Sequence, residues 1–163
     1  MEKTLSNLQS SVAFSSAPPY VSVFVPARNE AGNIPTLMEK IARAFQTLAL
    51  DGEVIFVDDG STDATWQEAL AAAEKYPFIH LYRHRRTFGL TEAMRTGFRH
   101  VRGDVIVFLP SDLESDPEQD IPKLLAKLDE GYDVVAGWRQ GRNDGKVFAS
   151  QIYNAVSRAL FHL

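Results

Sequence analysis

The stretch from Val54 to Asp63 constrains the fold more than any other part of the chain. Four apolar residues, mostly β-branched or aromatic, run without polar alternation into the acid pair Asp58 and Asp59, a glycine and two hydroxyl residues. This pattern is typical of a strand buried on both faces that ends in a polar turn. The hydroxyl residues, with Asp63 beside them, can cap a following helix. The stretch therefore predicts two carboxylates at the carboxyl edge of a parallel sheet, where open α/β sheets bind ligands; a solvated turn whose acids only cap a helix is the alternative.

Further apolar runs alternate with segments of helical periodicity. Strands joined by crossover helices predict a mostly parallel central sheet covered on both faces, which is a three-layer α/β/α fold. The expected strands are residues 21–25, 54–57, 78–82, 105–109 and 132–137, and the expected helices are residues 33–48, 64–75, 90–101 and 117–129.

Composition excludes several classes of protein. A chain of 163 residues with 45% hydrophobic and 23% charged residues predicts one soluble domain, over residues 20–163, preceded by a mobile leader over residues 1–19. The net charge of −4 argues against a nucleic-acid partner. The chain has no cysteine, so neither a disulfide nor a thiolate metal site is expected, as suits a cytoplasmic protein. No apolar run approaches the roughly 20 residues that cross a bilayer.

Polar clusters follow each expected strand directly. Because the carboxyl ends of parallel strands meet at one edge of a sheet, these clusters predict a single cleft. The clusters are residues 26–30, 58–59, 83–89, 111–114 and 138–139.

The order and spacing of four motifs resemble those of family 2 glycosyltransferases with the GT-A (Rossmann-like) fold, in the dolichyl- or polyprenyl-phosphate sugar transferase branch. The motifs are residues 25–30, residues 57–63, Gly89 with Ala93 and Gly97, and residues 131–139. The resemblance implies a nucleotide-diphosphate donor, a UDP- or GDP-sugar, and a polyprenyl or dolichyl phosphate acceptor. It implies donor-binding roles for Pro26, Ala27, Arg28, Glu30, Asp58, Gly89, Ser111 and Arg139.

The same resemblance implies that Asp112 and Glu114 hold Mg²⁺ or Mn²⁺ against the donor diphosphate. A hard cation with oxygen ligands stabilises the charge that develops on a departing diphosphate. If the backbone is extended at these residues, side chains two apart point the same way. A solvated acidic turn before Pro117 is the alternative. Three arginines, Arg83, Arg85 and Arg86, are expected either to attract the diphosphate or to be surface charge.

The chain departs from the family pattern in three places. Pro110 replaces the first Asp of the Asp-X-Asp element, and Thr87 and Leu90 replace a usual Asn and a usual Lys or Gln in the donor pocket. No residue matches the family's catalytic Asp, so the catalytic residue is unknown. These departures leave two readings: an inverting, metal-dependent transferase or part of one, and a non-catalytic nucleotide-sugar-binding or assembly module. A phosphorylation-receiver domain is disfavoured because its acid pair should follow the first strand.

Residues 147–161 carry apolar side chains at helical spacing, with Arg142, Lys146 and Arg158 adding positive charge. Such a helix can rest peripherally on the cytoplasmic face of a membrane, beside a lipid-linked acceptor. Packing on its own domain or on a partner is the alternative, and an uncovered apolar face would favour homo-oligomers.

Overall fold

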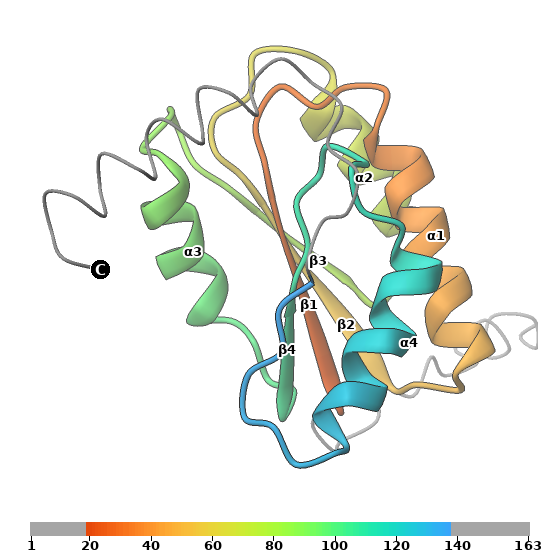
Figure 1. Cartoon of the computed structure of the whole chain (residues 1–163). Helices are drawn as coiled ribbons and strands as arrows, with labels where there is room; N and C mark the ends of the chain where they lie inside the picture. Colours follow the sequence, from red (N-terminus) through yellow and green to blue (C-terminus); the bar gives the residue numbers. More distant parts are fainter. Residues whose placement is uncertain (1–18, 138–163) are drawn as a thin grey trace, which may run out of the picture. The chain divides into compact units, whose positions relative to one another are not determined.

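The computed structural model describes residues 19–137. The chain divides into two compact units, Met1–Ala126 and Lys127–Leu163. In the described part of the first unit, parallel strands alternate with helices (Figure 1). In chain order the elements are β1 (Val21–Ala27), α1 (Ile34–Thr47), β2 (Gly52–Asp58), α2 (Thr65–Lys75), β3 (Ile79–Arg83), α3 (Leu90–Phe98), β4 (Val105–Phe108) and α4 (Pro117–Leu128), whose last residues belong to the second unit.

The sheet has the strand order β3-β2-β1-β4, and every pairing is parallel. Its register places Ala27 beside Asp58, and Asp58 beside Arg83, so the ends of β1, β2 and β3 lie side by side. β4 pairs with β1 up to Phe24 and Phe108. The predicted α/β fold with a parallel sheet is confirmed, and the turns that follow the strands share one edge.

Helices cover both faces of this sheet. α1, α2 and α4 lie on one face and α3 lies on the other (Figure 1). The larger core joins α1, α2 and α4 to the sheet through side chains such as Leu37, Ile41, Ala69 and Ile121. The smaller core packs Ala93 of α3 against Phe24, Ile55 and Val57. Burying these apolar side chains supplies most of the driving force for folding.

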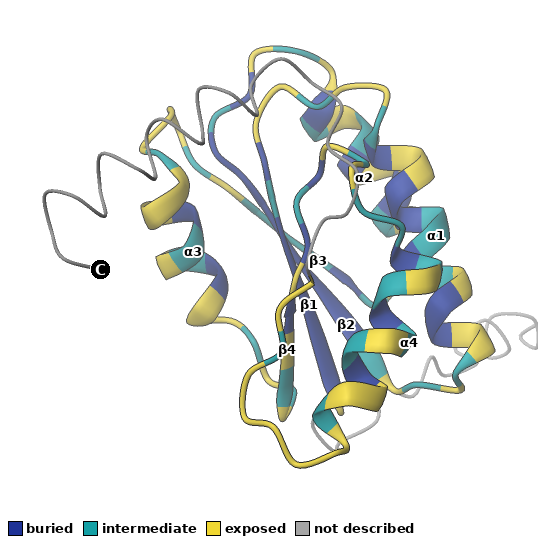
Figure 2. Cartoon of the chain, viewed as in Figure 1, coloured by how far each residue is buried: buried dark blue, intermediate teal, exposed yellow. Residues whose placement is uncertain are grey.

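β1 and β2 are central strands, and their long apolar runs are buried on both faces, as predicted (Figure 2). β1 continues through Pro26 to Ala27, although Pro26 was expected to end it. β4 also has no polar residue, yet Ile106 and Phe108 are 46% and 42% exposed. Among the described strands β4 has a neighbour on one side alone, which leaves that part of its surface uncovered.

The start of α2 differs from the expected cap. Neither Ser61 nor Thr62 caps this helix; the carboxylate of Asp63 accepts hydrogen bonds from the backbone N–H (3.0 Å) and the hydroxyl of Thr65. Ser61 instead accepts a hydrogen bond from the backbone N–H of Asn29. The hydroxyl therefore joins two turns where a helix cap was predicted.

The described part of the second unit is residues 127–137. The strand expected at residues 132–137 does not form: these residues have no regular secondary structure, and Val134 is 84% exposed. A β-branched run becomes a strand only when a neighbouring strand pairs with it, and none among the described residues does. The expected leader, Arg139 and the amphipathic segment at residues 147–161 lie outside the described residues, except for Pro19. Within residues 19–137, no helix is long and apolar enough to cross a membrane.

Candidate functional site

A cleft of about 430 Å³ opens at the carboxyl edge of the sheet, between the ends of β1 and β4 and the start of α3. It brings together seven of the residues expected to bind donor or metal. The residues lining it are Pro26, Ala27, Arg28, Glu30, Asp59, Gly89, Leu90, Ala93, Phe108, Pro110, Ser111 and Asp112. The predicted cleft therefore exists in the first unit, but it is not the single cleft that was expected. Residues 83–87 line a different pocket, and residues 138–139 lie outside the described residues.

The turn after β1 is joined to the turn after β2. The backbone N–H of Asn29 donates to Ser61 Oγ (3.0 Å), and Asn29 Oδ1 accepts from the backbone N–H of Thr62 (2.9 Å). Asn29 has a φ of 54°, a left-handed conformation that asparagine tolerates better than most residues. The next backbone N–H, that of Glu30, donates to Thr65 Oγ1 (2.8 Å). These bonds fix the backbone that presents Arg28 to the cleft.

The two acids that follow β2 have different environments. Asp58 is fully buried and does not line the cleft: its Oδ1 accepts from the backbone N–H of Ser61 (2.8 Å), and its Oδ2 lies 3.0 Å from Arg83 Nε in an ion pair without hydrogen-bond geometry. Asp59 is the carboxylate on the cleft wall. Successive side chains of a strand point to opposite sides, so only one of two adjacent acids can face a given cleft.

The carboxylate of Asp59 joins three segments of the chain. It accepts hydrogen bonds from the backbone N–H groups of Phe88 (2.9 Å) and Gly89 (2.8 Å), and from His84 Nδ1 (2.7 Å). Burial raises the pKa of the Asp59 carboxyl, but the hydrogen bonds from Phe88, His84 and Gly89 together outweigh burial and hold this pKa below its ordinary value. Asp59 is therefore ionised at neutral pH, and it holds Gly89, at the start of α3, against the end of β2.

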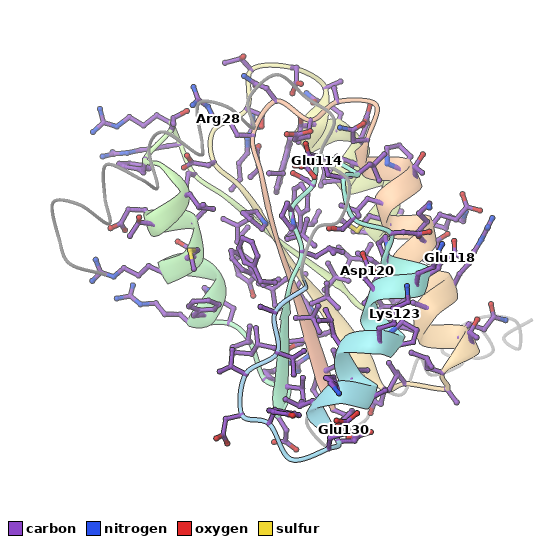
Figure 3. The ribbon with its side chains drawn as sticks, in the orientation of Figure 1. Arg28, Glu114, Glu118, Asp120, Lys123 and Glu130 are labelled. Atoms are coloured by element: carbon purple, nitrogen blue, oxygen red, sulfur yellow. The ribbon has the colours of Figure 1, made fainter. Side chains whose placement is uncertain are left out.

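The loop after β4 carries the expected metal ligands. The hydroxyl of Ser111 is held beneath the cleft by donating to the carbonyl of Pro26 (2.9 Å), and Asp112 is exposed on the cleft wall. Leu113 has a φ of 58°, and the backbone N–H of Glu114 donates to Asp112 Oδ1 (3.0 Å). The backbone is a tight turn where an extended segment was assumed, so the side chains of Asp112 and Glu114 do not align by strand alternation. Glu114 lies at the same end of the sheet as Arg28 but is not part of the cleft lining (Figure 3).

Asp112 can serve as one protein ligand of a divalent cation, because its carboxylate is exposed in the cleft. Residues 19–137 contain no cluster of three or more His, Asp or Glu side chains arranged to hold a metal ion. Mg²⁺ commonly takes one or two carboxylates together with substrate phosphates and waters, and does not need a cage made entirely of protein ligands. An exposed carboxylate on the wall of a cleft fits that mode of binding.

Other residues differ from their expected positions or were not anticipated. Arg83 is engaged by Asp58 and lines a different pocket from the cleft. Sequence reasoning placed Asp59 and His84 in polar clusters of the expected cleft but gave neither residue a binding role. Asp59 could be identified as the acid that lines the cleft only once the facing of β2 was known. No sequence motif identifies His84.

A parallel α/β sheet with a polar cleft at its carboxyl edge defines a ligand-binding protein of the doubly wound class. The chain belongs to glycosyl transferase family 2, whose family model matches residues 22–162. Two of its relatives are named undecaprenyl-phosphate 4-deoxy-4-formamido-L-arabinose transferase. The one from Enterobacter sp. (strain 638) is 44% identical, over 76% of this chain and 38% of the relative. The one from Erwinia tasmaniensis is 41% identical, over 88% of this chain and 42% of the relative. This chain therefore spans about two fifths of the length of these relatives.

Solved structures agree with the fold. Glucosyl-3-phosphoglycerate synthase from Mycobacterium tuberculosis, in complex with UDP, has a TM-score of 0.67 and 25% identity over 87% of this chain and 50% of that one. A mannosyltransferase from Pyrobaculum calidifontis, in complex with GDP-Man and Mn²⁺, has a TM-score of 0.53 and 30% identity. The match covers 60% of this chain and 28% of the mannosyltransferase. The expected GT-A fold is confirmed by these neighbours.

Proposed function

We propose that this chain is a glycosyltransferase, or the donor-binding part of one, that moves a sugar from a nucleotide-diphosphate donor to a polyprenyl or dolichyl phosphate. The reaction is metal-dependent, with Mg²⁺ or Mn²⁺, and it inverts the configuration at the sugar carbon that is attacked. The observation that carries this proposal is the convergence of Arg28, Asp59 and Asp112 on one cleft, from turns that follow three different strands.

The chemistry of the cleft supports a nucleotide-sugar donor. Arg28 offers an exposed cation and Asp112 an exposed carboxylate, which suit a diphosphate and its divalent cation respectively. When bound, the cation would neutralise charge on the departing diphosphate. Gly89 lines the cleft without a side chain, so the donor can approach the backbone at the start of α3. Its φ of 95° is a conformation that glycine adopts without strain. The solved relatives bind UDP in one case and GDP-Man in the other, so both nucleotides are candidates.

The proposed acceptor is a lipid phosphate, since the two relatives described above are named for undecaprenyl phosphate. A lipid acceptor places the reaction at a membrane surface, and we propose a peripheral position on its cytoplasmic face. No residue of the 163 is assigned to the general-base step, in which the acceptor oxygen is deprotonated or oriented for attack on the sugar carbon.

A non-catalytic nucleotide-sugar-binding module is the second candidate, and Pro110 favours it because this residue lines the cleft where the family has an acid. A turnover assay separates the two. The chain is incubated with UDP- or GDP-sugars, Mn²⁺ and undecaprenyl phosphate, and release of UDP or GDP is measured. Release that requires the lipid supports transfer. Donor binding without release excludes transfer by this chain alone and leaves the module or the donor-binding part of a transferase. Absence of binding to every donor contradicts all of these.

A further inference from the structure

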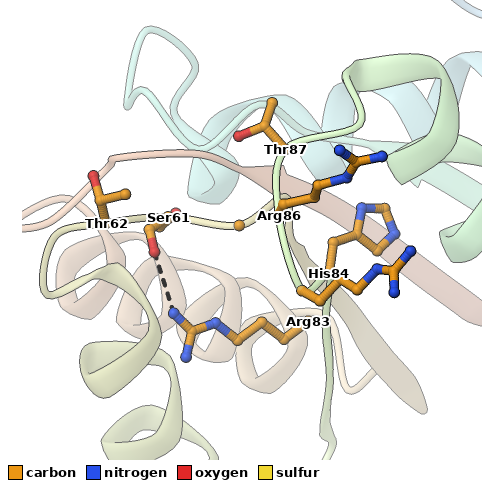
Figure 4. Close-up of a pocket in the computed structure, with 8 residues that line it drawn as sticks. Ser61, Thr62, Arg83, His84, Arg86 and Thr87 are labelled. Atoms are coloured by element: carbon orange, nitrogen blue, oxygen red, sulfur yellow. Dashed lines mark hydrogen bonds between the residues drawn. The ribbon is translucent and has the colours of Figure 1, made fainter.

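A second pocket of about 660 Å³ lies between the turn after β2 and the loop after β3 (Figure 4). Among residues 19–137, it shares no lining residue with the cleft, and no carboxylate lines it. Its lining consists of Gly60, Ser61, Thr62, Arg83, His84, Arg85, Arg86 and Thr87. Positive charge is therefore concentrated here, in a chain whose net charge is −4.

The positively charged groups of this pocket fall into two kinds. Arg83 is neutralised by the buried carboxylate of Asp58 and also donates to the carbonyl of Ser61 (3.1 Å), as Figure 4 shows. Arg85 and Arg86 are exposed, and neither forms an ion pair with a residue of the described part of the chain. Arg86 lies over the ring of Phe88 (5.0 Å to the centroid), which leaves the N–H groups at its edge available. Two guanidinium groups thus lack a compensating charge.

The loop that carries these two arginines is held at both of its ends. At its start the backbone N–H of His84 donates to the carbonyl of Asp58 (2.8 Å), and at its end Thr87 Oγ1 donates to the carbonyl of Asp59 (3.1 Å). Gly60 allows the loop to approach closely, because a Cβ there would lie 2.4 Å from the backbone carbon of Arg86. A loop fixed in this way loses little conformational entropy on binding a ligand.

The strand order separates this pocket from the expected metal ligand. Arg85 follows β3 at one edge of the sheet, whereas Asp112 follows β4 at the other. Three strand spacings of about 4.8 Å separate the two strands by roughly 14 Å, which is wider than a diphosphate. Arg85 and Arg86 line this pocket and not the cleft that contains Asp112, so these two arginines are available to another anion.

We propose that this pocket is a phosphate-binding site, distinct from the site of the donor diphosphate, in which Arg85 and Arg86 bind the anion. Guanidinium groups match phosphate oxygens in geometry and form strong charge-assisted hydrogen bonds with them. The ligand is a phosphate group, either free or in the headgroup of an anionic lipid. The site does not depend on the proposed transferase function, since neither arginine lines the cleft proposed to bind the donor.

The test is a calorimetric titration of the 163-residue chain with inorganic phosphate and with pyrophosphate, beside a sedimentation assay with phosphatidylglycerol and phosphatidylcholine vesicles. The variant R85A/R86A is compared with R95A/R99A, which removes the same charge from exposed positions on and just after α3. We expect R85A/R86A to weaken binding about tenfold or more, as loss of hydrogen bonds to a charged ligand does, and R95A/R99A to weaken it less than about twofold. Binding of the free anions identifies soluble phosphate as the source, and selective binding of phosphatidylglycerol vesicles identifies the headgroup.

Three results would overturn the proposal. The wild-type chain could bind neither the free anions nor the phosphatidylglycerol vesicles. Both double variants could weaken binding equally, which would mean that net charge alone is responsible. UDP with Mn²⁺ could displace phosphate completely, which would place the anion in the cleft. None of these results contradicts the proposed binding of a nucleotide sugar in the cleft.

Discussion

Asp59 Oδ1 lies 2.7 Å from His84 Nδ1, and the opposite ring nitrogen of His84 lies 2.9 Å from the hydroxyl of Thr96. An ionised carboxylate can only accept, so Nδ1 donates to Asp59, while Nε2 forms a hydrogen bond with the hydroxyl of Thr96. The imidazole therefore connects the end of β2 to α3 and fixes the orientation of the Asp59 carboxylate on the cleft wall.

Replacing Asp59 with alanine leaves the N–H groups of Phe88 and Gly89, and His84, without their acceptor. We expect the free energy of unfolding to fall by about 2–4 kcal/mol, since hydrogen bonds to a charged group are lost and partly buried donors are left unpaired. Urea denaturation measures this change. D104N is the control, because Asp104 is exposed, and it should change stability by less than about 0.5 kcal/mol. Equal stabilities for D59A and wild type would show that this carboxylate does not hold the site together.

Gly60 and Gly32 form a matched pair for alanine substitution. Both have positive φ, 70° and 90°, but a Cβ at Gly60 would lie 2.4 Å from backbone of Arg86, whereas a Cβ at Gly32 meets nothing within 4 Å. We expect G32A to cost about 1 kcal/mol for its backbone conformation alone, and G60A to cost at least twice that. Thermal denaturation compares the two variants. Similar melting temperatures would mean that the turn after β2 does not pack against the Arg86–Thr87 backbone.

Glu53 tests whether stability and ligand binding are separable. This residue is 2% exposed near the start of β2, and its carboxylate accepts from Ser22 Oγ (2.7 Å) and from Arg102 Nε (2.9 Å) and Nη2 (2.6 Å). We expect E53Q to lose about 2 kcal/mol of stability, because the charge-assisted hydrogen bonds from Arg102 are weakened. The loss is not larger because Arg102 is partly exposed and is not left as a buried charge. Nucleotide affinity should not change, since Glu53 lies five residues along β2 from Asp58, or about 17 Å from the cleft edge. A parallel loss of affinity in calorimetry would show that the two ends of the sheet are coupled.

Acid should destabilise the protein through these two carboxylates. Burial raises the pKa of Glu53, but hydrogen bonds from Ser22 and Arg102 outweigh it, so that the pKa lies below its ordinary value of 4.5; the pKa of Asp59 likewise lies below 3.8. The unfolded chain therefore binds more protons, and the stability present above these ordinary values is lost as pH falls through the folded pKa values. Urea midpoints measured from pH 7 to about pH 3 should decline, and they should decline less in E53Q. A flat profile would contradict the depressed pKa values.

The sequence predicted the elements well where a single physical signal decided them. The apolar runs of β1 and β2 and the helical spacing of Leu37 and Ile41 are local signals that tertiary contacts reinforce. β4 was recognised as a strand, but its place at the edge of the described sheet depends on strand order, which a short apolar run does not encode.

The clusters of the site and seven residues that line the cleft were predicted, but not the facing of every side chain within a cluster. Asp58 and Asp59 are adjacent, and which one faces the cleft depends on the facing of β2 in the sheet. Asp112 and Glu114 were expected to point the same way by strand alternation, and they do not align in this way, because Leu113 adopts a left-handed backbone conformation. Leucine gives no sequence signal for this conformation. His84 joins the site through hydrogen bonds with Asp59, which follows β2, and with Thr96 of α3, and only the folded arrangement brings these residues together.

The central claim is that the cleft binds a nucleotide diphosphate through a divalent cation at Asp112. The most direct measurement is calorimetric titration of UDP-sugars and GDP-mannose, with and without Mn²⁺, into the wild type and D112N. We predict binding that requires Mn²⁺ in the wild type and is weakened at least about tenfold in D112N, with the unfolding free energy of the unliganded variant unchanged within about 0.5 kcal/mol. Binding of equal strength in D112N, or no binding of any donor by the wild type with Mn²⁺, would contradict the claim.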